Sequence, residues 1–495
     1  MQLISTRNKS AAVTSAEAFL QGIAPDGGLY VPEGYPKFSG EEIAAFAQMD
    51  YRERAARVLT PYLTDYTAQE ITSCVQGAYC DNFGGHPAPL VPLETCHMME
   101  LWHGPTSAFK DVALQLLPRL LTMARGKQDV DEEIMILVAT SGDTGKAALA
   151  GFADVPGTHI LVFYPDGGVS EAQRLQMATQ KGGNVHVAAV RGNFDDTQTG
   201  VKQLFTSEAF INRQKTRGRI LSSANSINFG RLVPQVVYYF SAYADLLSKG
   251  VLRAGDSVNF AVPTGNFGNI LAAWYAREMG LPIAKLICAS NRNNVLTDFI
   301  DTGCYNRKRD FFLTSSPSMD ILISSNLERL LFDLCERDDA LVKRWMSSLR
   351  KCGGYNIGGD RSRAMQEIFH GGWVDDARVS ETIAKVWARE HYLLDTHTAV
   401  ARAVYDDYRA QTGDTTPTVI ASTANPYKFP RDVLGAIEGE TPESEFACAD
   451  RLEALTGVAM PAALRELRDL PVLHGTVCDI PQMGDIVGLL VDGQG

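Results

Sequence analysis

Short apolar runs alternate with longer amphipathic runs through the middle of the chain, and this alternation constrains the fold more than any other feature. The short runs are β-branched and continuously apolar, which is typical of strands buried on both faces of a parallel sheet. The segments between them have helical periodicity. We therefore expect an α/β fold of open, mostly parallel, twisted sheets with helices on both faces. The expected strands are residues 134–139, 159–164, 184–190, 257–262, 284–289 and 418–421.

The chain of 495 residues is too long for one hydrophobic core, because single cores stop growing near ~250–300 residues. Residues 1–95 are mainly helical in pattern and end in a Gly/Pro-rich stretch, N-F-G-G-H-P-A-P-L-V-P-L, that is typical of a connector. We expect an N-terminal domain over 1–95, a smaller α/β lobe over 96–255, and a larger α/β lobe with a C-terminal extension over 256–495.

Charge and cysteine content narrow the class of partner. The net charge of −12 and the pI near 5.3 disfavour nucleic acid and anionic membranes, which the protein would repel. The nine cysteines are scattered without a C-x-x-C pair, which argues against a disulfide framework or a zinc site. The N-terminus lacks a secretory apolar core, and no run approaches the ~20 apolar residues of a membrane span. We expect a cytoplasmic protein that acts on a small molecule, with no metal.

Three loops that directly follow expected strands are unusual. They are T-S-G-D-T-G-K after 134–139, P-T-G-N-F-G-N after 257–262, and S-T-A-N-P-Y-K-F-P after 418–421. Ligands of open sheets gather at the carboxyl ends of strands, and a helix N-terminus binds anions through its free N–H groups. The first two loops open helices, so we expect two anion sites.

Neither loop fits a common nucleotide motif. Thr140 and Ala147 stand where a Walker loop needs glycine and Ser or Thr, and Gly265 and Gly268 lack the third glycine of a dinucleotide motif. ATP and NAD are therefore not supported as ligands.

Lys110 stands in H-G-P-T-S-A-F-K-D, between a turn and an apolar helical run that contains Pro118. We expect Lys110 in or just before the first helical turn, with a kink at Pro118. The helix dipole and burial both disfavour a cation there, so both lower its pKa. An uncharged amine is what a lysine needs to form a Schiff base. The alternative is an ordinary lysine that reaches solvent or pairs with Asp111.

Several strings together resemble one enzyme family. In order they are L-W-H-G-P-T-S-A-F-K-D, T-S-G-D-T-G, S-A-N-S-I-N, P-T-G-N-F-G-N and S-T-A-N-P-Y-K-F-P. They resemble threonine synthase of the longer bacterial and fungal type, and the resemblance runs from G-I-A-P-D-G-G-L-Y-V-P near the N-terminus to beyond Pro430. It implies pyridoxal phosphate (PLP) as cofactor and the fold of tryptophan synthase β and threonine dehydratase, with two lobes and an N-terminal domain.

The resemblance also implies a cofactor site. Lys110 would hold PLP as a Schiff base and then move protons as the catalytic residue. Thr423 would hydrogen-bond the pyridine nitrogen, which makes the ring a weaker electron sink than a carboxylate would. Asp143 would face the phenolic oxygen, where relatives often carry Asn. The cofactor phosphate would be bound by one turn, formed by Gly265, Asn266, Phe267, Gly268 and Asn269.

The substrate site is implied in the same way. The substrate carboxylate would be gripped by N–H groups of the loop from Thr140 to Gly145, including Ser141 and Gly142. The substrate phosphate would be bound by Thr144, Asn225, Ser226 and Arg231, because a planar guanidinium meets phosphate oxygens in pairs.

The roles of two further residues, Asn425 and His397, stay open. Asn425 stands where relatives commonly have His, so it can hydrogen-bond but not exchange a proton near neutral pH. His397 either lines the site or is structural.

The implied reaction converts O-phospho-L-homoserine and water to L-threonine and phosphate by γ-elimination and β-hydration, the last step of threonine biosynthesis. The enzyme would be a carbon–oxygen lyase, a monomer or homodimer. One alternative is a phospho-lyase or dehydratase that releases a 2-oxo acid from the same scaffold. A cofactor-free paralogue is the other, and the presence of Lys110, Gly265 and Gly268 argues against it.

Overall fold

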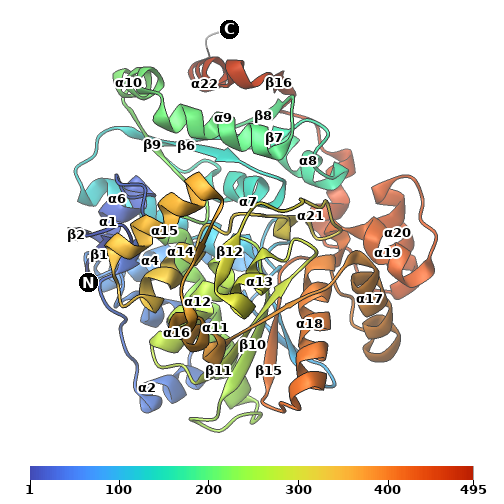
Figure 1. The fold of residues 1–495 in the computed structure, drawn as a ribbon. Coiled ribbons are helices and arrows are strands. Elements are labelled where there is room, and N and C mark those ends of the chain that lie inside the picture. Colours follow the sequence, from blue (N-terminus) through green and yellow to red (C-terminus); the bar gives the residue numbers. More distant parts are fainter. Residues whose placement is uncertain (494–495) are drawn as a thin grey trace.

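A large sheet occupies the lower half of the view in Figure 1. The computed structural model describes residues 1–493. Neighbouring strands of the large sheet are parallel, except for the antiparallel pair β4 and β5 at one edge. From edge to edge its six strands are β14 (Phe369–Trp373), β11 (Ile283–Ser290), β10 (Val258–Pro263), β15 (Thr418–Ser422), β5 (His97–Glu100) and β4 (Leu90–Pro92).

A smaller sheet lies above it in Figure 1. Its neighbouring strands are all parallel. In order they are β16 (Thr476–Cys478), β8 (Val185–Val190), β7 (Thr158–Pro165), β6 (Glu133–Ala139) and β9 (Arg219–Ser222). The α/β fold of mostly parallel sheets is therefore confirmed, and each of the six expected strands matches an observed strand to within one residue at each end.

Helices bury both faces of each sheet. In the large sheet, Phe260 and Val262 of β10 point into the core formed with α11 (Phe229–Ser248) and α12 (Gly268–Glu278), whereas Ala261 points into the core under α18 (Thr396–Thr412). In the small sheet, α6 (Leu117–Lys127) and α7 (Asp143–Phe152) cover one face, and α9 (Phe194–Thr206) and α22 (Met483–Asp492) cover the other. Burial on both faces explains why the strands read as continuous apolar runs.

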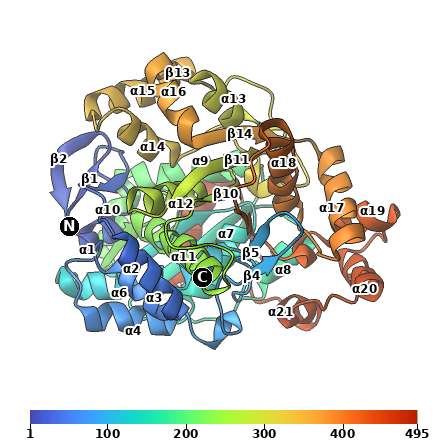
Figure 2. The same ribbon diagram turned by 90° about the horizontal axis from the view of Figure 1, so that it is seen from below.

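The N-terminal domain packs against the helices of the lobes. It contains a three-stranded sheet in the order β2-β1-β3 and four helices, of which α1 contacts α6 and α3 contacts α11. Seen from below in Figure 2, this domain lies on one side of the large sheet, and the helices α17 (Asp376–Glu390), α19 (Pro430–Glu438) and α20 (Glu445–Thr456) lie on the other. The domain's elements are β1 (Leu3–Ser5), β2 (Asn8–Val13), β3 (Tyr30–Pro32), α1 (Ser15–Gln21), α2 (Gly40–Ala45), α3 (Tyr51–Leu59) and α4 (Ala68–Ala78).

None of the helices within residues 1–493 is both long and apolar enough to cross a membrane.

The remaining helices and strands extend the two lobes. These elements are α5 (Lys110–Leu114), α8 (Glu171–Ala178), α10 (Glu208–Thr216), α13 (Val295–Thr302), β12 (Cys304–Asn306), α14 (Leu327–Leu334), α15 (Asp339–Cys352), β13 (Gly354–Asn356), α16 (Gly359–Ile368), α17 (Asp376–Glu390), α19 (Pro430–Glu438), α20 (Glu445–Thr456) and α21 (Ala462–Arg465).

The expected domain boundaries do not coincide with the two sheets. Strand β4 lies in the stretch expected to be a connector, yet it pairs with β5 at the edge of the large sheet. Strand β5 falls in the segment 96–255 expected to form the smaller lobe, yet it pairs with β15 of the large sheet. Near the C-terminus, β16 joins β8 of the small sheet. Strand pairing between distant segments thus makes each lobe discontinuous in sequence.

Each sheet has a point where the strand order reverses, and the unusual loops follow the strands that flank it. In the small sheet the chain runs from β6 through β7 to β8 and then returns to place β9 on the other side of β6. In the large sheet it runs from β10 through β11 to β14 and returns to place β15 beside β10. Such switch points open a crevice at the carboxyl ends of the flanking strands, where ligands bind.

Arg329 in α14 ties the N-terminal domain to this region. Its side chain is fully buried and donates to the carbonyls of Tyr30 in β3 (2.8 Å) and Ile227 (2.6 Å), and to the side-chain oxygen of Asn326. Asn326 in turn donates to the carbonyl of Asn266, in the turn after β10 (2.9 Å). A single buried guanidinium therefore joins the N-terminal sheet to the loops of the large lobe.

We expect Arg329→Met to lower the free energy of unfolding by roughly 3 kcal/mol, because it leaves buried carbonyl oxygens without donors. Thermal denaturation followed by circular dichroism measures the loss. Arg363→Met is the matched control, since Arg363 is 72% exposed in its pair with Asp360 and such surface pairs contribute at most about 1 kcal/mol. Equal melting temperatures for the two variants would contradict this role of Arg329.

Candidate active site

Lys110 is held at the end of β15 by backbone pairing. Ala108 and Ala424 form an antiparallel bridge, in which the N–H of Phe109 donates to the carbonyl of Thr423 (2.8 Å). Lys110 is the first residue of α5, which ends at Leu114 before α6 starts, so the expected helix start and the break near Pro118 are confirmed. This pairing puts Lys110 beside the switch point of the large sheet.

The Lys110 amine is buried among charged and polar groups. Its Nζ lies 3.6 Å from Asp143 Oδ2 and 3.4 Å from Ser318 Oγ. Burial lowers the pKa of Lys110 below its usual value; Asp143 opposes this shift, while the charges of Lys428 and Arg231 add to it. The expected direction of the pKa shift is confirmed, with burial as the main cause.

Asp143, at the first turn of α7, also contacts Lys428, which lies closer to it than Lys110 does. Lys428 Nζ lies 2.7 Å from Asp143 Oδ1, and Gln173 Nε2 donates to the same oxygen (3.1 Å). Burial acts to raise the pKa of Asp143, but the charges of Lys428 and Lys110 outweigh it and hold the pKa well below its usual value. Asp143 is therefore a carboxylate, which decides a protonation state that the sequence left open.

The turn after β10 has the form of an anion site. Phe267 has a left-handed backbone (φ 61°) that caps α12, and a Cβ on Gly265 would lie 2.7 Å from the carbonyl oxygen of Ser318. Within the described chain, the N–H groups of residues 266–269 have no hydrogen-bond acceptor. Asn269 accepts from Tyr238 and Tyr239 (2.6 Å each), while its buried Nδ2 is without a partner. These free donors fit an anion such as a phosphate.

A second anion site is built at the start of α11, after β9. Arg231 is 3% exposed, and its Nη1 donates to the carbonyl of Ala224 (2.9 Å), whereas its Nε is buried without a partner in the described chain. Burial lowers the pKa of Arg231 to about 10. A Cβ on Gly268 would lie 3.9 Å from Ser226 Cβ, so this segment adjoins the turn after β10. An incompletely bonded, buried guanidinium calls for an anionic ligand.

In the loop from Thr140 to Gly145, some of the backbone N–H groups donate to an acceptor within the loop itself. Thr140 Oγ1 accepts from the N–H groups of Gly142 (3.0 Å) and Gly145 (2.9 Å), which fixes the turn. Gly142 has a backbone φ of 134°, which residues with a Cβ rarely adopt, so a larger residue is disfavoured there. The Gly142 N–H is therefore already bonded, and the N–H groups of Ser141, Asp143 and Thr144 remain to face a ligand.

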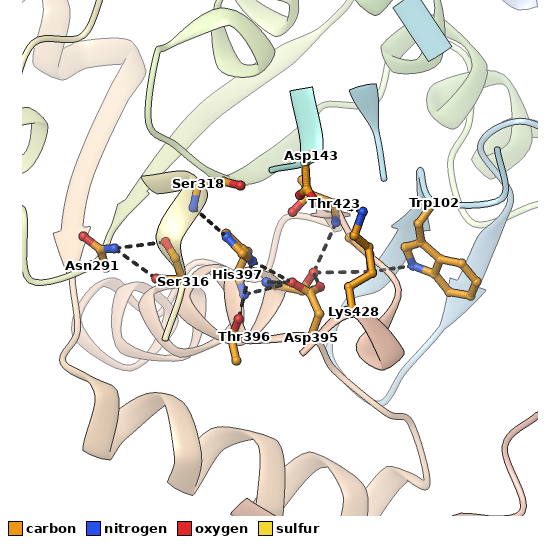
Figure 3. A network of polar contacts seen from close by, with 12 residues as sticks. Trp102, Asp143, Asn291, Ser316, Ser318, Asp395, Thr396, His397, Thr423 and Lys428 are labelled. Atoms are coloured by element: carbon orange, nitrogen blue, oxygen red, sulfur yellow. Dashed lines mark hydrogen bonds and ion pairs between the residues drawn. The ribbon is translucent and has the colours of Figure 1, made fainter. Parts of the chain in front are cut away.

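A buried polar network connects Ser318, which contacts Lys110, to Thr423 through His397 and Asp395 (Figure 3). The N–H of Ser318 donates to His397 Nε2 (3.1 Å), so that nitrogen carries no hydrogen, and Nδ1 donates to Asp395 Oδ1 (3.2 Å). Asp395 also accepts from the hydroxyl of Thr398, which in turn accepts from the N–H of Thr423 (3.2 Å). His397 is buried, with 3% of its surface exposed. Its hydrogen bond with the Ser318 N–H orients the loop that carries Ser318.

Three site residues were missed in the sequence: Lys428, Ser318 and Gln173. Lys428 lies in the S-T-A-N-P-Y-K-F-P string, where a lysine in a loop directly after a buried strand is a signal that could have identified it. Ser318 and Gln173 gave no signal in the sequence, because only the folded chain brings Ser318 to Lys110 and Gln173 to Asp143. Asn425 accepts from the N–H of Tyr427 (3.0 Å), which is a capping role within its own loop.

The site fits PLP on its own chemistry. A buried amine with a lowered pKa suits an aldehyde. The free N–H groups of the turn after β10 suit a phosphate. Thr423 lies one residue from the bridge that fixes Lys110, on the floor of the same crevice. A second anion site at Arg231 remains for another ligand.

Comparison with known proteins agrees with this fit. Residues 2–79 match the family model for the threonine synthase N terminus, residues 84–423 that for pyridoxal-phosphate dependent enzymes, and residues 398–471 that for the threonine synthase C-terminal region.

Relatives and solved structures cover almost the whole chain. Threonine synthase of Pseudomonas aeruginosa is 40% identical over 92% of this chain and 94% of its own length. Human threonine synthase-like 1 is 40% identical over 90% of this chain, which spans 62% of that longer protein. The crystal structure of PLP-bound threonine synthase from Brucella melitensis superposes with a TM-score of 0.88 at 38% identity, covering 100% of this chain and 99% of that one. The chain belongs to the threonine synthase family of PLP-dependent enzymes.

Proposed function

We propose that this protein converts O-phospho-L-homoserine and water to L-threonine and phosphate in the cytoplasm. The observation that carries the proposal is the arrangement of two anion sites around one buried amine. The turn at residues 265–269 offers free N–H groups, and the segment beside it leads to Arg231, which has a buried, unpartnered Nε and a charge that acts on Lys110. An enzyme that uses PLP on a phosphorylated amino acid needs a site for each phosphate.

Lys110 is proposed as the residue that holds PLP and moves protons. When bound, PLP supplies an electron sink that acidifies the hydrogens on the substrate carbons next to the amino group. The chain's part is to place a base there: burial lowers the pKa of Lys110, which favours the amine form whose nitrogen electron pair can take the α proton. Ser318 Oγ at 3.4 Å accepts from the amine and fixes its direction.

The substrate is proposed to lie between the small-lobe loops. The N–H groups of Ser141, Asp143 and Thr144 have no acceptor within the described chain and would bind the carboxylate. Arg231, with Asn225 and Ser226, would bind the phosphate and stabilise the charge that grows on it as the carbon–oxygen bond breaks. Asn225 Nδ2 and Ser226 Oγ have no hydrogen-bond partner within residues 1–493, so both are free for this role.

Product analysis with PLP and O-phospho-L-homoserine tests the function. Threonine and phosphate should form in equal amounts, because water adds to the β carbon after the phosphate leaves. Formation of 2-oxobutyrate without threonine would instead identify a phospho-lyase on the same scaffold. Neither product, with no visible absorbance after PLP is added, would favour a cofactor-free role.

We expect Lys110→Ala to lose the visible absorbance band of lysine-bound PLP and to lose turnover by several orders of magnitude, on the order of 10³-fold or more. Its circular dichroism spectrum should match that of the unmodified protein, because Lys110 lies at the surface of a crevice and not in a hydrophobic core. Borohydride reduction followed by peptide mass spectrometry locates the modified lysine. Lys127→Ala is the control, since Lys127 pairs with Glu70 away from the site.

We expect Arg231→Met to reduce kcat/KM for O-phospho-L-homoserine by about 100-fold, since one charge-assisted contact to phosphate is lost. Arg231→Lys keeps the charge but not the two-pronged geometry, so its loss should be intermediate. Steady-state kinetics and competitive inhibition by inorganic phosphate measure both effects. An unchanged inhibition constant for phosphate in Arg231→Met would place the substrate phosphate elsewhere.

A further inference from the structure

Lys428 is a buried cation to which the proposed mechanism gives no task. It lies in the short helix η4 (Pro426–Lys428) directly after the end of β15, and it is 1% exposed. Lysines are almost never buried to this extent without a partner, because removing an ammonium from water is costly. The surroundings of Lys428 therefore have to account for its position.

Three acceptors surround the Lys428 ammonium, which has three hydrogens to donate. They are Asp143 Oδ1 (2.7 Å), the carbonyl of Thr106 (3.0 Å) and Gln176 Oε1 (3.3 Å). Asp143 and Gln176 belong to small-lobe helices, whereas Lys428 follows a strand of the large sheet. These three acceptors, one of them a carboxylate, match the three donors of a lysine ammonium, and the contact joins the two lobes beside Lys110.

Asp143 is shared unequally between the two lysines. Its Oδ1 is occupied by Lys428 (2.7 Å) and Gln173 (3.1 Å), while its Oδ2 lies 3.6 Å from Lys110 Nζ. The latter distance is longer than a good hydrogen bond. The single negative charge of Asp143 thus lies near two lysine amines, and its close ion pair is with Lys428. Among the described residues, Lys110 would be the one lysine left in contact with this buried carboxylate if Lys428 were removed.

We propose that Lys428 is a positioning residue of the active site, which occupies the Asp143 carboxylate and thereby leaves Lys110 as the uncharged amine that reacts with the PLP aldehyde. This inference rests on the proposed role of Lys110. It explains how an aspartate can stand next to the cofactor lysine without holding that lysine in its charged, unreactive form. The charge of Lys428 also lowers the pKa of Lys110 directly, in the same direction.

Other charged groups around this cluster limit the pH range of a test. Arg231 from α11 also lowers the pKa of Lys110, and His397 from α18 faces Asp143. Burial raises the pKa of Asp111 in α5 to about 6, and burial lowers the pKa of Lys146 in α7 to about 8. Measurements between about pH 7 and pH 10 keep Asp111 ionised and cover the range in which a perturbed lysine titrates. Lys146 also titrates within this range, but it is present in every variant, so the comparison rests on differences between their midpoints.

The test follows capture of PLP by the full-length protein after its cofactor has been removed. The growth of the visible band of lysine-bound PLP is recorded by stopped-flow absorbance across this pH range, which gives the pH midpoint of capture. Lys428→Gln removes the charge but keeps a donor for the Thr106 carbonyl. We expect its midpoint to rise by about one pH unit, and capture at neutral pH to slow about tenfold.

A second substitution separates charge from packing. Asp143→Asn should move the midpoint of capture down, and Lys428→Gln with Asp143→Asn should cancel the rise and return the midpoint to or below that of the unmodified protein. A merely structural Lys428 would slow capture equally at every pH, and Asp143→Asn would not reverse the effect. Lys127→Gln, which removes the lysine of a 2.8 Å pair with Glu70, should leave the midpoint unchanged.

The possible results are distinguishable. An unshifted midpoint in folded Lys428→Gln overturns the inference, while Lys110→Ala still abolishes the band and the proposed function stands. If Lys428→Gln fails to fold, as judged by circular dichroism, Asp143→Asn alone decides, because an unmoved midpoint there also overturns the inference. If Lys110→Ala keeps the band, the proposed role of Lys110 fails, and this inference fails with it.

Discussion

The backbone pairing between the lysine loop and the end of β15 is the constraint on which the site depends. The bridge at Ala108 and Ala424 joins a segment that enters the small lobe to the strand beside the switch point of the large sheet. Ser107, just before it, adopts a left-handed backbone (φ 59°), a conformation that non-glycine residues adopt only where surrounding contacts enforce it. Because the bridge uses main-chain groups, the position of Lys110 depends on strand pairing and not on its own side-chain contacts.

Electrostatics inside the crevice follow from burial. Lys428 and Arg231 are two cations near the Lys110 amine, and Asp143 is the carboxylate among them. In water such charges would interact weakly, whereas in a buried site each one changes the protonation of its neighbours. The excess of positive charge suits ligands that carry two phosphates and a carboxylate. It also disfavours a proton on the one amine that has the longest contact to the carboxylate.

Much of this arrangement could be predicted from the sequence, because its signals are local. Strands buried on both faces produce continuous apolar runs, and the turn at 265–269 shows its glycines and helix start directly. Strand β14, F-H-G-G-W, was missed because two glycines interrupt any apolar pattern. Ser318 lies on a loop with no periodicity, and it reaches Lys110 only through the contact of its own N–H with His397. Partners set by tertiary contacts carry no local signal.

The pairing of β16 with β8 has a consequence for how the chain is made. While the ribosome synthesises the protein, the small sheet can assemble up to β9, but the outer edge of β8 stays unpaired until residues 476–478 emerge. An open strand edge is a template for the strands of other chains. The nascent small lobe therefore has an open edge from the synthesis of Val190 until that of Thr476, and a chain cut short before β16 would leave that edge open permanently.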